Sequence, residues 1–268
     1  MSAHTDVSAD PVLVERRGHT VVVTLNRPEA RNAVNMALAA AAGDAFDAAE
    51  NDPDVRVIVI TGSGTAAFSA GADLKAIGRG EPILPPGREA WGLAGFSRRV
   101  FSKPTIAAVN GVALGGGMEI ALAADFIVAA DTARFGLPEV KRGLIAAAGG
   151  AFRILDQVPR KVGLEMLLTG EPIDASRALE LNLVNRVVPG DRLLDEALAL
   201  AEKVAANAPL AVQASKRIAL GIRDGVPDGD EKRWQLSAEE TARNSASADA
   251  KEGVLAFAEK RPPVWQGR

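Results

Sequence analysis

Several residues that carry chemistry in other proteins are absent or scarce in this chain. The 268 residues include no cysteine, which excludes disulfides, thiolate metal sites and cysteine nucleophiles and is compatible with a reducing cytoplasm. The two histidines are His4, near the N-terminus, and His19, at a turn between two β-rich runs. They supply neither a Ser-His-Asp arrangement nor a histidine metal site, so we expect no metal. Catalysis by this chain must therefore depend on carboxylates and backbone groups.

The chain also lacks a strong charge excess and a long apolar run. Its 31 basic and 34 acidic residues give a net charge of −3, so we expect no nucleic-acid partner. Residues 1–10 are polar with no apolar segment, and they predict a flexible leader rather than a signal peptide. The longest uncharged stretch, residues 104–118, is too short for a membrane span and contains several glycines. We expect a soluble, cytoplasmic protein with no membrane partner.

Alternating β-rich and helical segments predict an α/β fold of ordinary globular composition. Two β-rich runs at 12–15 and 20–25 surround a short turn, and this predicts a hairpin. A helix is expected over 36–50, where an asparagine precedes an alanine-rich run with apolar residues at helical spacing. A buried strand at 55–61 follows that helix. The same order then recurs in a strand at 105–109, a glycine-rich bend at 111–117, a helix at 118–124 and a strand at 126–129. The recurrence predicts stacked ββα units.

From about residue 158 onward the pattern becomes helical. Helices are expected at 160–168, 174–181, 193–206 and 210–221, and a turn-rich solvated connection at 222–232 precedes a last helical section. The chain is therefore divided into a leader (1–10), a ββα core carrying the site (11–200) and a C-terminal helical region (201–268).

Three glycine-containing segments are candidates for binding through the backbone. Residues 62–67 match the spacing G-x-G-x-x-A, but another backbone-exposing loop follows where a dinucleotide-binding fold requires a helix, which argues against that function. Residues 69–74 and 114–119 each place small residues where a helix begins. Two N–H groups directed at one point would form an oxyanion hole. The alternative interpretation is that both segments are tight turns selected for close packing.

Two glutamates are candidates for proton transfer. Glu119 is the only charged residue between Pro104 and Ala124, and burial without a cationic partner would raise its pKa toward the range useful for acid–base catalysis. The alternative is a glutamate favoured by the helix dipole. Glu139 follows a proline-fixed turn, where functional residues are common. Lys141 and Arg142 are close to it in sequence, so a surface ion pair is the competing interpretation.

These segments together resemble the crotonase (enoyl-CoA hydratase/isomerase) superfamily over residues 12–268. The resemblance is carried by LNRPEARNA at 25–33, FSAGADLK at 68–75, NGVALGGGME at 110–119, FGLPE at 135–139 and AFAEKR at 256–261. It implies an α/β fold with a crotonase-type ββα superhelix (spiral) core and a C-terminal helical trimerisation region. It also implies a homotrimer, commonly paired into a hexamer.

The resemblance further implies a hydratase site. The backbone N–H groups of Ala72 and Gly116 would bind the thioester oxygen, and Glu119 and Glu139 would be the two hydratase carboxylates. Coenzyme A, as part of the acyl-CoA substrate and not as a cofactor, is expected to contact a set of seven residues: Glu29, Ala30, Ala70, Asp73, Leu74 and, from a neighbouring subunit, Phe257 and Lys260. No other cofactor is implied. The leading expectation is reversible addition of water to a 2-enoyl-CoA in fatty acid metabolism.

Three features leave the substrate open. Many hydratases have Pro-Gly after the second glutamate, where this chain has Ala146 and Ala147. The tail from 256 to 268 is similar to that of carnitinyl-CoA dehydratases, which favours a polar acyl group. The segment 77–101, with Trp91 and Phe96, is a candidate acyl-pocket lid or a surface loop packed on the core. Other acyl-CoA chemistry, and a non-catalytic CoA-binding scaffold, remain alternatives.

Overall fold

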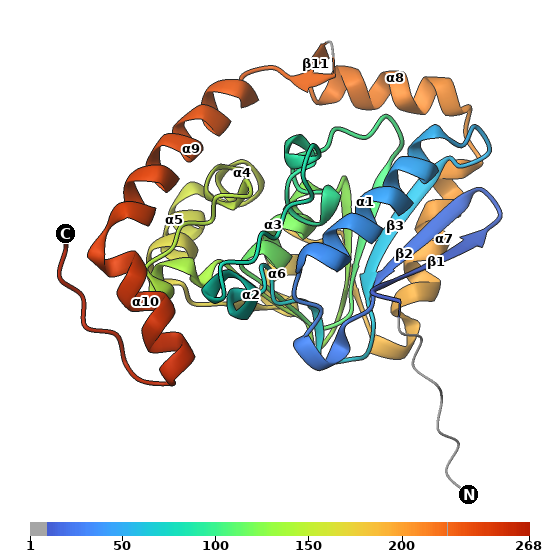
Figure 1. Ribbon diagram of the computed structural model, residues 1–268. Coiled ribbons are helices and arrows are strands. Elements are labelled where there is room, and N and C mark those ends of the chain that lie inside the picture. The colour runs from blue at the N-terminus through green and yellow to red at the C-terminus, as the bar shows by residue number, and fades with distance from the viewer. Residues whose placement is uncertain (1–9, 224) are drawn as a thin grey trace, which may run out of the picture.

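The computed structural model describes residues 10–223 and 225–268, so the predicted leader lies outside the described residues except for residue 10. Two sheets form the centre of the fold (Figure 1). The six-stranded sheet has the order β1-β2-β3-β5-β7-β10. Its strands are β1 (Val12–Arg17), β2 (Thr20–Leu25), β3 (Val57–Gly62), β5 (Thr105–Val109), β7 (Phe126–Ala130) and β10 (Arg186–Val188). The four-stranded sheet has the order β4-β6-β8-β9, with β4 (Ala67–Ser69), β6 (Val112–Leu114), β8 (Arg134–Gly136) and β9 (Ile173–Asp174).

The predicted ββα repeat is confirmed. Three successive units each give their first strand to the large sheet and their second strand to the small one, and the strands of one sheet run parallel from unit to unit. A helix follows each pair: α2 (Leu74–Gly78), α3 (Gly116–Ala123) and α4 (Gly150–Gln157). The predicted hairpin of β1 and β2 is also confirmed, and β2 joins β3 in parallel. The repeat places the turns after β4, β6 and β8 next to one another.

Burial on both faces explains why β3 is an uninterrupted apolar strand. Successive side chains of a strand point to opposite faces. Ile58 and Ile60 join the main core on the side of α1 (Met36–Asn51), whereas Val57 and Val59 pack against α7 (Leu193–Ala205). The predicted α1 is confirmed, with the Asn35 side chain accepting a hydrogen bond from the Leu38 N–H at its start. Both helices thus hold the large sheet in place behind the site.

The C-terminal helices form an arch over the core (Figure 1). It consists of α8 (Pro209–Ala219), the short strands β11 (Ile222–Arg223) and β12 (Val226–Pro227), α9 (Asp230–Ala246) and α10 (Ala248–Glu259). Neither α8 nor α9 buries a residue in this single chain. The β11–β12 pair lies within the connection predicted to be only turn-rich, and the predicted boundary at 200/201 falls inside α7.

The remaining elements connect these layers. They are α5 (Arg160–Thr169), α6 (Ala175–Glu180) and the 3-10 helices η1 (Pro28–Ala30), η2 (Glu89–Trp91), η3 (Leu93–Gly95), η4 (Pro138–Arg142) and η5 (Gly190–Arg192). Within the described ranges, no helix has both the length and the apolar character needed to cross a bilayer.

Candidate active site

The backbone N–H groups of Ala72 and Gly116 lie close together and are free. A Cβ placed on Gly71 would lie 2.5 Å from the Gly116 nitrogen, and one placed on Gly116 would lie 3.3 Å from the Ala72 nitrogen. Ala72 pairs with Val34 in an isolated parallel bridge. The two hydrogen bonds of this bridge are made by the residues on either side of Ala72: the Val34 N–H donates to the Gly71 carbonyl, and the Asp73 N–H donates to the Val34 carbonyl. The N–H of Ala72 therefore points away from Val34. Gly116 begins α3, where an N–H has no partner inside the helix. Over the part of the chain that the structure describes, neither N–H donates to a protein acceptor.

Glycine is required where the two segments meet. Gly71 has a φ of +83°, which L-residues rarely adopt, and its missing Cβ leaves room for the Gly116 N–H. Both donors therefore open onto the same space, as an oxyanion hole requires. The alternative interpretation of these segments as tight turns describes their shape but not the two unused donors.

Glu119 is buried in the first turn of α3, with only 3% of its surface exposed. Its Oε1 accepts a hydrogen bond of 2.9 Å from the N–H of Gly150, the first residue of α4. Among the described residues it makes no ion pair. Burial, followed by the nearby charge of Glu139, raises the pKa of Glu119 to about 8, while the N–H groups of Gly150 and Ala148 and the charge of Arg153 oppose that rise.

Glu139 stands on η4, immediately after Pro138. The neighbouring cations do not pair with it: Lys141 binds Glu171, and Arg142 lies over the ring of Phe257 at 4.6 Å. The interpretation of Glu139 as a surface ion pair is therefore wrong. Its Oε2 is buried without a hydrogen-bond partner in the described part of the chain, and burial raises the pKa of Glu139 to about 7.

The two carboxyl groups and the two N–H groups share one site. A Cβ on Gly115, the residue before α3, would lie 3.2 Å from the Glu139 Oε1. Glu119 and Glu139 also interact electrostatically, so their protons are held by the pair rather than by either residue alone. With both pKa values raised into the neutral range, the pair can offer one carboxylate and one carboxylic acid at the same time.

An ion pair fixes the loop that carries Ala72. Arg27 donates to the Asp73 carboxylate at 3.0 Å and to the Ala33 carbonyl, while Asp73 caps the start of α2 through the N–H groups of Lys75 and Ala76. Asn32 bonds the carbonyls of Ser63 and Ala67. Arg27 and Asn32 thus orient the segment that carries the Ala72 N–H.

The structure brings most of the predicted coenzyme A residues together. Glu29 and Ala30 lie on η1, and the Ala70 N–H bonds to the Arg31 carbonyl that follows them. Asp73 and Leu74 begin α2 in the adjacent loop. Phe257, on α10, and Lys260, just after it, belong to a segment that packs against α2 and η4 of the same chain. Contact of these residues with coenzyme A, and the origin of the last two from a neighbouring subunit, stay predictions.

In the segment 77–101, the two aromatic residues singled out from the sequence face α1. Phe96 is buried against Phe46 and Phe101, and Trp91 packs on Gly43 beneath the guanidinium of Arg99. Their part in an acyl pocket stays a prediction. Leu93 is the residue of this segment that reaches the oxyanion hole, since its Cδ2 lies 2.2 Å from the position of a Cβ on Gly116.

Three contributors were not identified from the sequence. Leu93, Gly150 and Arg153 act through residues that are distant in the sequence, so the local sequence around each of them gives no signal. The run of residues 145–150 was noted as a departure, and it is the loop that delivers the Gly150 N–H to Glu119.

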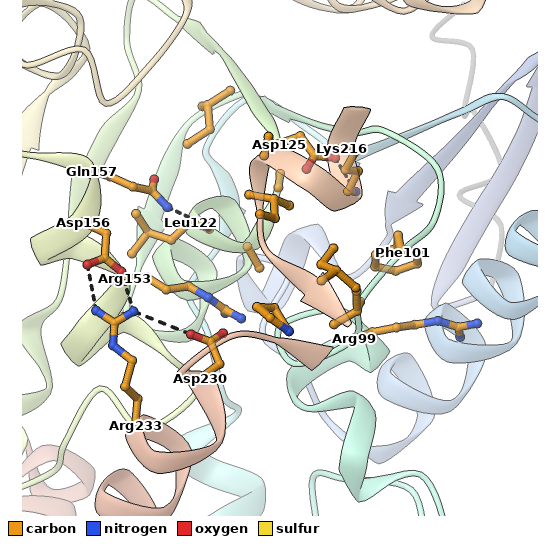
Figure 2. A pocket seen from close by; sticks show the side chains of 18 of the residues that line it. Arg99, Phe101, Leu122, Asp125, Arg153, Asp156, Gln157, Lys216, Asp230 and Arg233 are labelled. Atoms are coloured by element: carbon orange, nitrogen blue, oxygen red, sulfur yellow. Dashed lines mark hydrogen bonds and ion pairs between the residues drawn. The ribbon is translucent and has the colours of Figure 1, made fainter. Parts of the chain in front are cut away.

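A cavity of about 630 Å³ lies on the other side of α3, between its C-terminal end, α4, α8 and the start of α9 (Figure 2). Neither glutamate lines it. Its wall is polar, with Arg233 bound to Asp156 and Asp230, and with Arg153 and Lys216 nearby (Figure 2). Of the residues that line this cavity, Arg153 is the one whose charge acts on Glu119.

Known proteins resemble this chain over nearly its whole length. Residues 15–268 match the family model for enoyl-CoA hydratase/isomerase. The enoyl-CoA hydratase EchA19 of Mycobacterium tuberculosis is 42% identical over 269 residues, with 97% of this chain and 98% of that protein covered. The carnitinyl-CoA dehydratase of Salmonella arizonae is 43% identical over 264 residues, with 97% and 99% covered. A crystal structure of carnitinyl-CoA hydratase from Mycobacterium avium is 56% identical with a TM-score of 0.95, covering 97% of this chain and 99% of that one.

Proposed function

The chain belongs to the enoyl-CoA hydratase/isomerase family, and from this premise we propose that it catalyses the reversible addition of water to a 2-enoyl-CoA, giving a 3-hydroxyacyl-CoA. One observation carries the proposal: two buried carboxyl groups with raised pKa values lie beside two free backbone N–H groups. This arrangement supplies a base, an acid and an oxyanion hole at one point.

The N–H groups of Ala72 and Gly116 would donate hydrogen bonds to the thioester oxygen of the substrate. Their hydrogen bonds draw electron density from the carbonyl and make C3 of the conjugated double bond electrophilic. They bind most strongly when the oxygen becomes an enolate, so they stabilise the transition state more than the substrate. Donors of this kind contribute roughly 10² to 10³ in rate each.

The glutamates would move the two protons of the reaction. Glu119 takes one proton from water as a carboxylate while the water oxygen bonds to C3, and Glu139 gives a proton to C2 as a carboxylic acid. Because the pKa of Glu119, about 8, is higher than that of Glu139, about 7, this is the less populated of the two protonation states between which the coupled pair exchanges. In the reverse direction Glu139 removes the C2 proton and Glu119 protonates the departing hydroxyl. Hydration leaves the proton on Glu119 and the negative charge on Glu139, so the pair exchanges one proton with solvent before the next turnover. Neither direction needs a metal or a redox cofactor.

Dehydration of carnitinyl-CoA is the second candidate, because relatives with 43% and 56% identity carry that name or the name of the reverse reaction. The carboxyl pair serves both reactions equally. The difference lies in the acyl chain, which ends in a trimethylammonium group in carnitinyl-CoA. Such a group prefers an open aromatic face, whereas the ring of Trp234, which lies beside Gly149, already has the guanidinium groups of Arg98 and Arg153 over it. On this ground we rank the uncharged 2-enoyl chain first.

We also propose that the chain forms a trimer, alone or paired into a hexamer. The arch exposes large apolar side chains that a partner would cover, among them Leu210 and Ile218 on α8, with 77% and 82% of their surfaces exposed. Sedimentation at equilibrium would show a particle of three or six times 27.9 kDa; a monomer would contradict the proposal.

The proposed reaction is tested by the loss of enoyl-thioester absorbance with crotonyl-CoA, a longer 2-enoyl-CoA and the dehydrated form of carnitinyl-CoA. The protein is compared with its Glu119→Gln and Glu139→Gln variants, which keep the shape of each side chain and remove its acid–base function. Turnover that falls by at least about 10² in each variant supports hydration. Turnover confined to the trimethylammonium substrate supports the second candidate. Binding of coenzyme A without turnover of any substrate favours other acyl-CoA chemistry or a non-catalytic scaffold.

A further inference from the structure

Arg153 is a partly buried cation at the third position after Gly150 on α4. Its Nη1 donates to the Ser97 carbonyl, and its guanidinium lies over the ring of Trp234 at 5.3 Å. A Cβ on Gly149 would lie 2.7 Å from the same Nη1. No carboxylate of the described residues forms an ion pair with it. Burial lowers the pKa of Arg153, and a cation held in this way without a bonded counter-ion calls for a functional reason.

On one side, Arg153 holds the segment that carries Leu93. The Ser97 carbonyl is its acceptor, and Ser97 is bound to Leu93 twice: the Leu93 N–H donates to the Ser97 Oγ at 2.9 Å, and the Ser97 N–H donates to the Leu93 carbonyl at 3.1 Å. Ala94, between them, has a φ of +56°, a conformation that persists only where its surroundings enforce it. The side chain of Leu93 in turn lies against Gly116.

On the other side, Arg153 belongs to the helix that holds Glu119. The first N–H of α4 binds the Glu119 carboxylate, and the Arg153 N–H continues the helix by bonding the Gly149 carbonyl. We propose that Arg153 is a positioning residue, which holds Leu93, beside the oxyanion hole, in a fixed position relative to the Glu119 carboxylate. The group that takes the proton from water and the N–H groups that bind the thioester oxygen then keep a constant distance and orientation. This inference rests on the proposed hydration.

The charge of Arg153 adds to its contacts. Burial and Glu139 oppose the ionised form of Glu119, and Arg153 is the cation that favours it. The other charged groups that act on Arg153 are Asp230 and Arg233 from α9 and Asp156 from its own helix, and Arg233 satisfies both of those carboxylates. Removal of the Arg153 charge therefore makes Glu119 harder to ionise. Arg98 also lies over the ring of Trp234, but it is exposed, so its removal leaves the ionisation of Glu119 unchanged.

The test measures kcat and KM for crotonyl-CoA hydration from pH 5.5 to 9.5 in the full chain and in four variants. Arg153→Met removes charge and contact, Arg153→Gln removes the charge but keeps a donor, Arg153→Lys keeps the charge, and Arg98→Met is the matched control. We expect Arg153→Met to lower kcat by about tenfold or more with a smaller change in KM. In the Met and Gln variants the rising limb of the pH profile moves to higher pH; in the Lys and Arg98 variants it stays in place.

A purely structural role would lower the amount of folded protein without moving that limb. If the wild type is active and the rising limb of the pH profile does not shift in Arg153→Met or Arg153→Gln, the inference about Arg153 is wrong and the proposed function still stands. Should Arg153→Met fail to fold, the comparison of Gln with Lys carries the same test. Absence of hydration by the wild type with any 2-enoyl-CoA overturns the proposed function and this inference together.

Discussion

The Oε1 of Glu119 accepts a 2.9 Å hydrogen bond from the backbone N–H of Gly150, a residue 31 positions later in the chain. This bond joins the helix of the second ββα unit to the first residue of the helix of the third. The loop of residues 145–149 leads into Gly150, whose N–H binds the carboxylate. The departure from the common Pro-Gly sequence is therefore compatible with an ordered Glu119.

Gly150→Ala is expected to displace Glu119. The added Cβ would lie 2.8 Å from the Glu119 Cγ and 3.0 Å from its Oε1, so the carboxylate must move. A displacement of this size can cost about 10² in kcat, with a smaller effect on KM because none of the residues predicted to contact coenzyme A is altered. Steady-state hydration kinetics check this. Gly190→Ala, whose Cβ would meet only Ala130 at 3.9 Å, is the control, and equal kcat values for the two variants would contradict the expectation.

Gly71→Ala is expected to close the oxyanion hole. Its Cβ would lie 2.5 Å from the Gly116 nitrogen, so the Gly116 N–H would have to move away from its position beside the Ala72 N–H. Loss of one donor lowers kcat by roughly 10² to 10³. Because Gly71 has a positive φ, the control is Gly18→Ala, which has a φ of +59° and no atom within 4 Å of the new Cβ. If the control loses as much activity as Gly71→Ala, backbone strain and not the oxyanion hole explains the result.

Glu119→Gln is expected to stabilise the fold at high pH while abolishing hydration. The folded-state pKa of about 8 lies above the ordinary 4.5, so the stability that the wild type has below pH 4.5 is progressively lost as pH rises toward 8. The amide does not ionise and avoids that loss. We expect an advantage on the order of 1–3 kcal/mol at pH 8 that disappears near pH 4.5, measured by denaturant unfolding at fixed protein concentration. A pH-independent difference would show that Glu119 is not buried in ionisable form.

The sequence predicted the structure best where an element depends on hydrophobic periodicity or on neighbouring residues in the chain. The ββα repeat, the hairpin and α1 follow from alternation, turn residues and the Asn35 cap, and Glu119 stood out because no other charge accompanies it on its helix. The β11–β12 pair was missed because two-residue strands have no period. Leu93 and Arg153 were missed because their roles depend on which segments meet in space: Leu93 on Gly116, and Arg153 on Ser97 and α4.

Leu93→Ala is expected to change the preference for substituents at C2 of the acyl group. The Leu93 side chain lies against Gly116, where the thioester oxygen would bind, so the carbon next to the thioester must lie beside it. A methyl group at C2 would occupy the space that the substitution opens. Since one methyl group in such a pocket is worth roughly 10- to 200-fold, the ratio of kcat/KM for a 2-methyl-2-enoyl-CoA over crotonyl-CoA should rise by about tenfold or more.

Two controls separate this effect from loss of stability. Leu193→Ala removes an equally buried leucine on the far face of the large sheet, and a cavity there costs about 2–5 kcal/mol without reaching the site. Trp91→Ala removes the larger side chain of the same segment, but one that packs on Gly43 of α1. A ratio that rises in Leu93→Ala alone makes Leu93 the wall of the acyl pocket. A ratio that rises in Trp91→Ala and not in Leu93→Ala would contradict the prediction. It would mean that the segment moves when substrate binds and that Trp91, not Leu93, forms the wall of the acyl pocket.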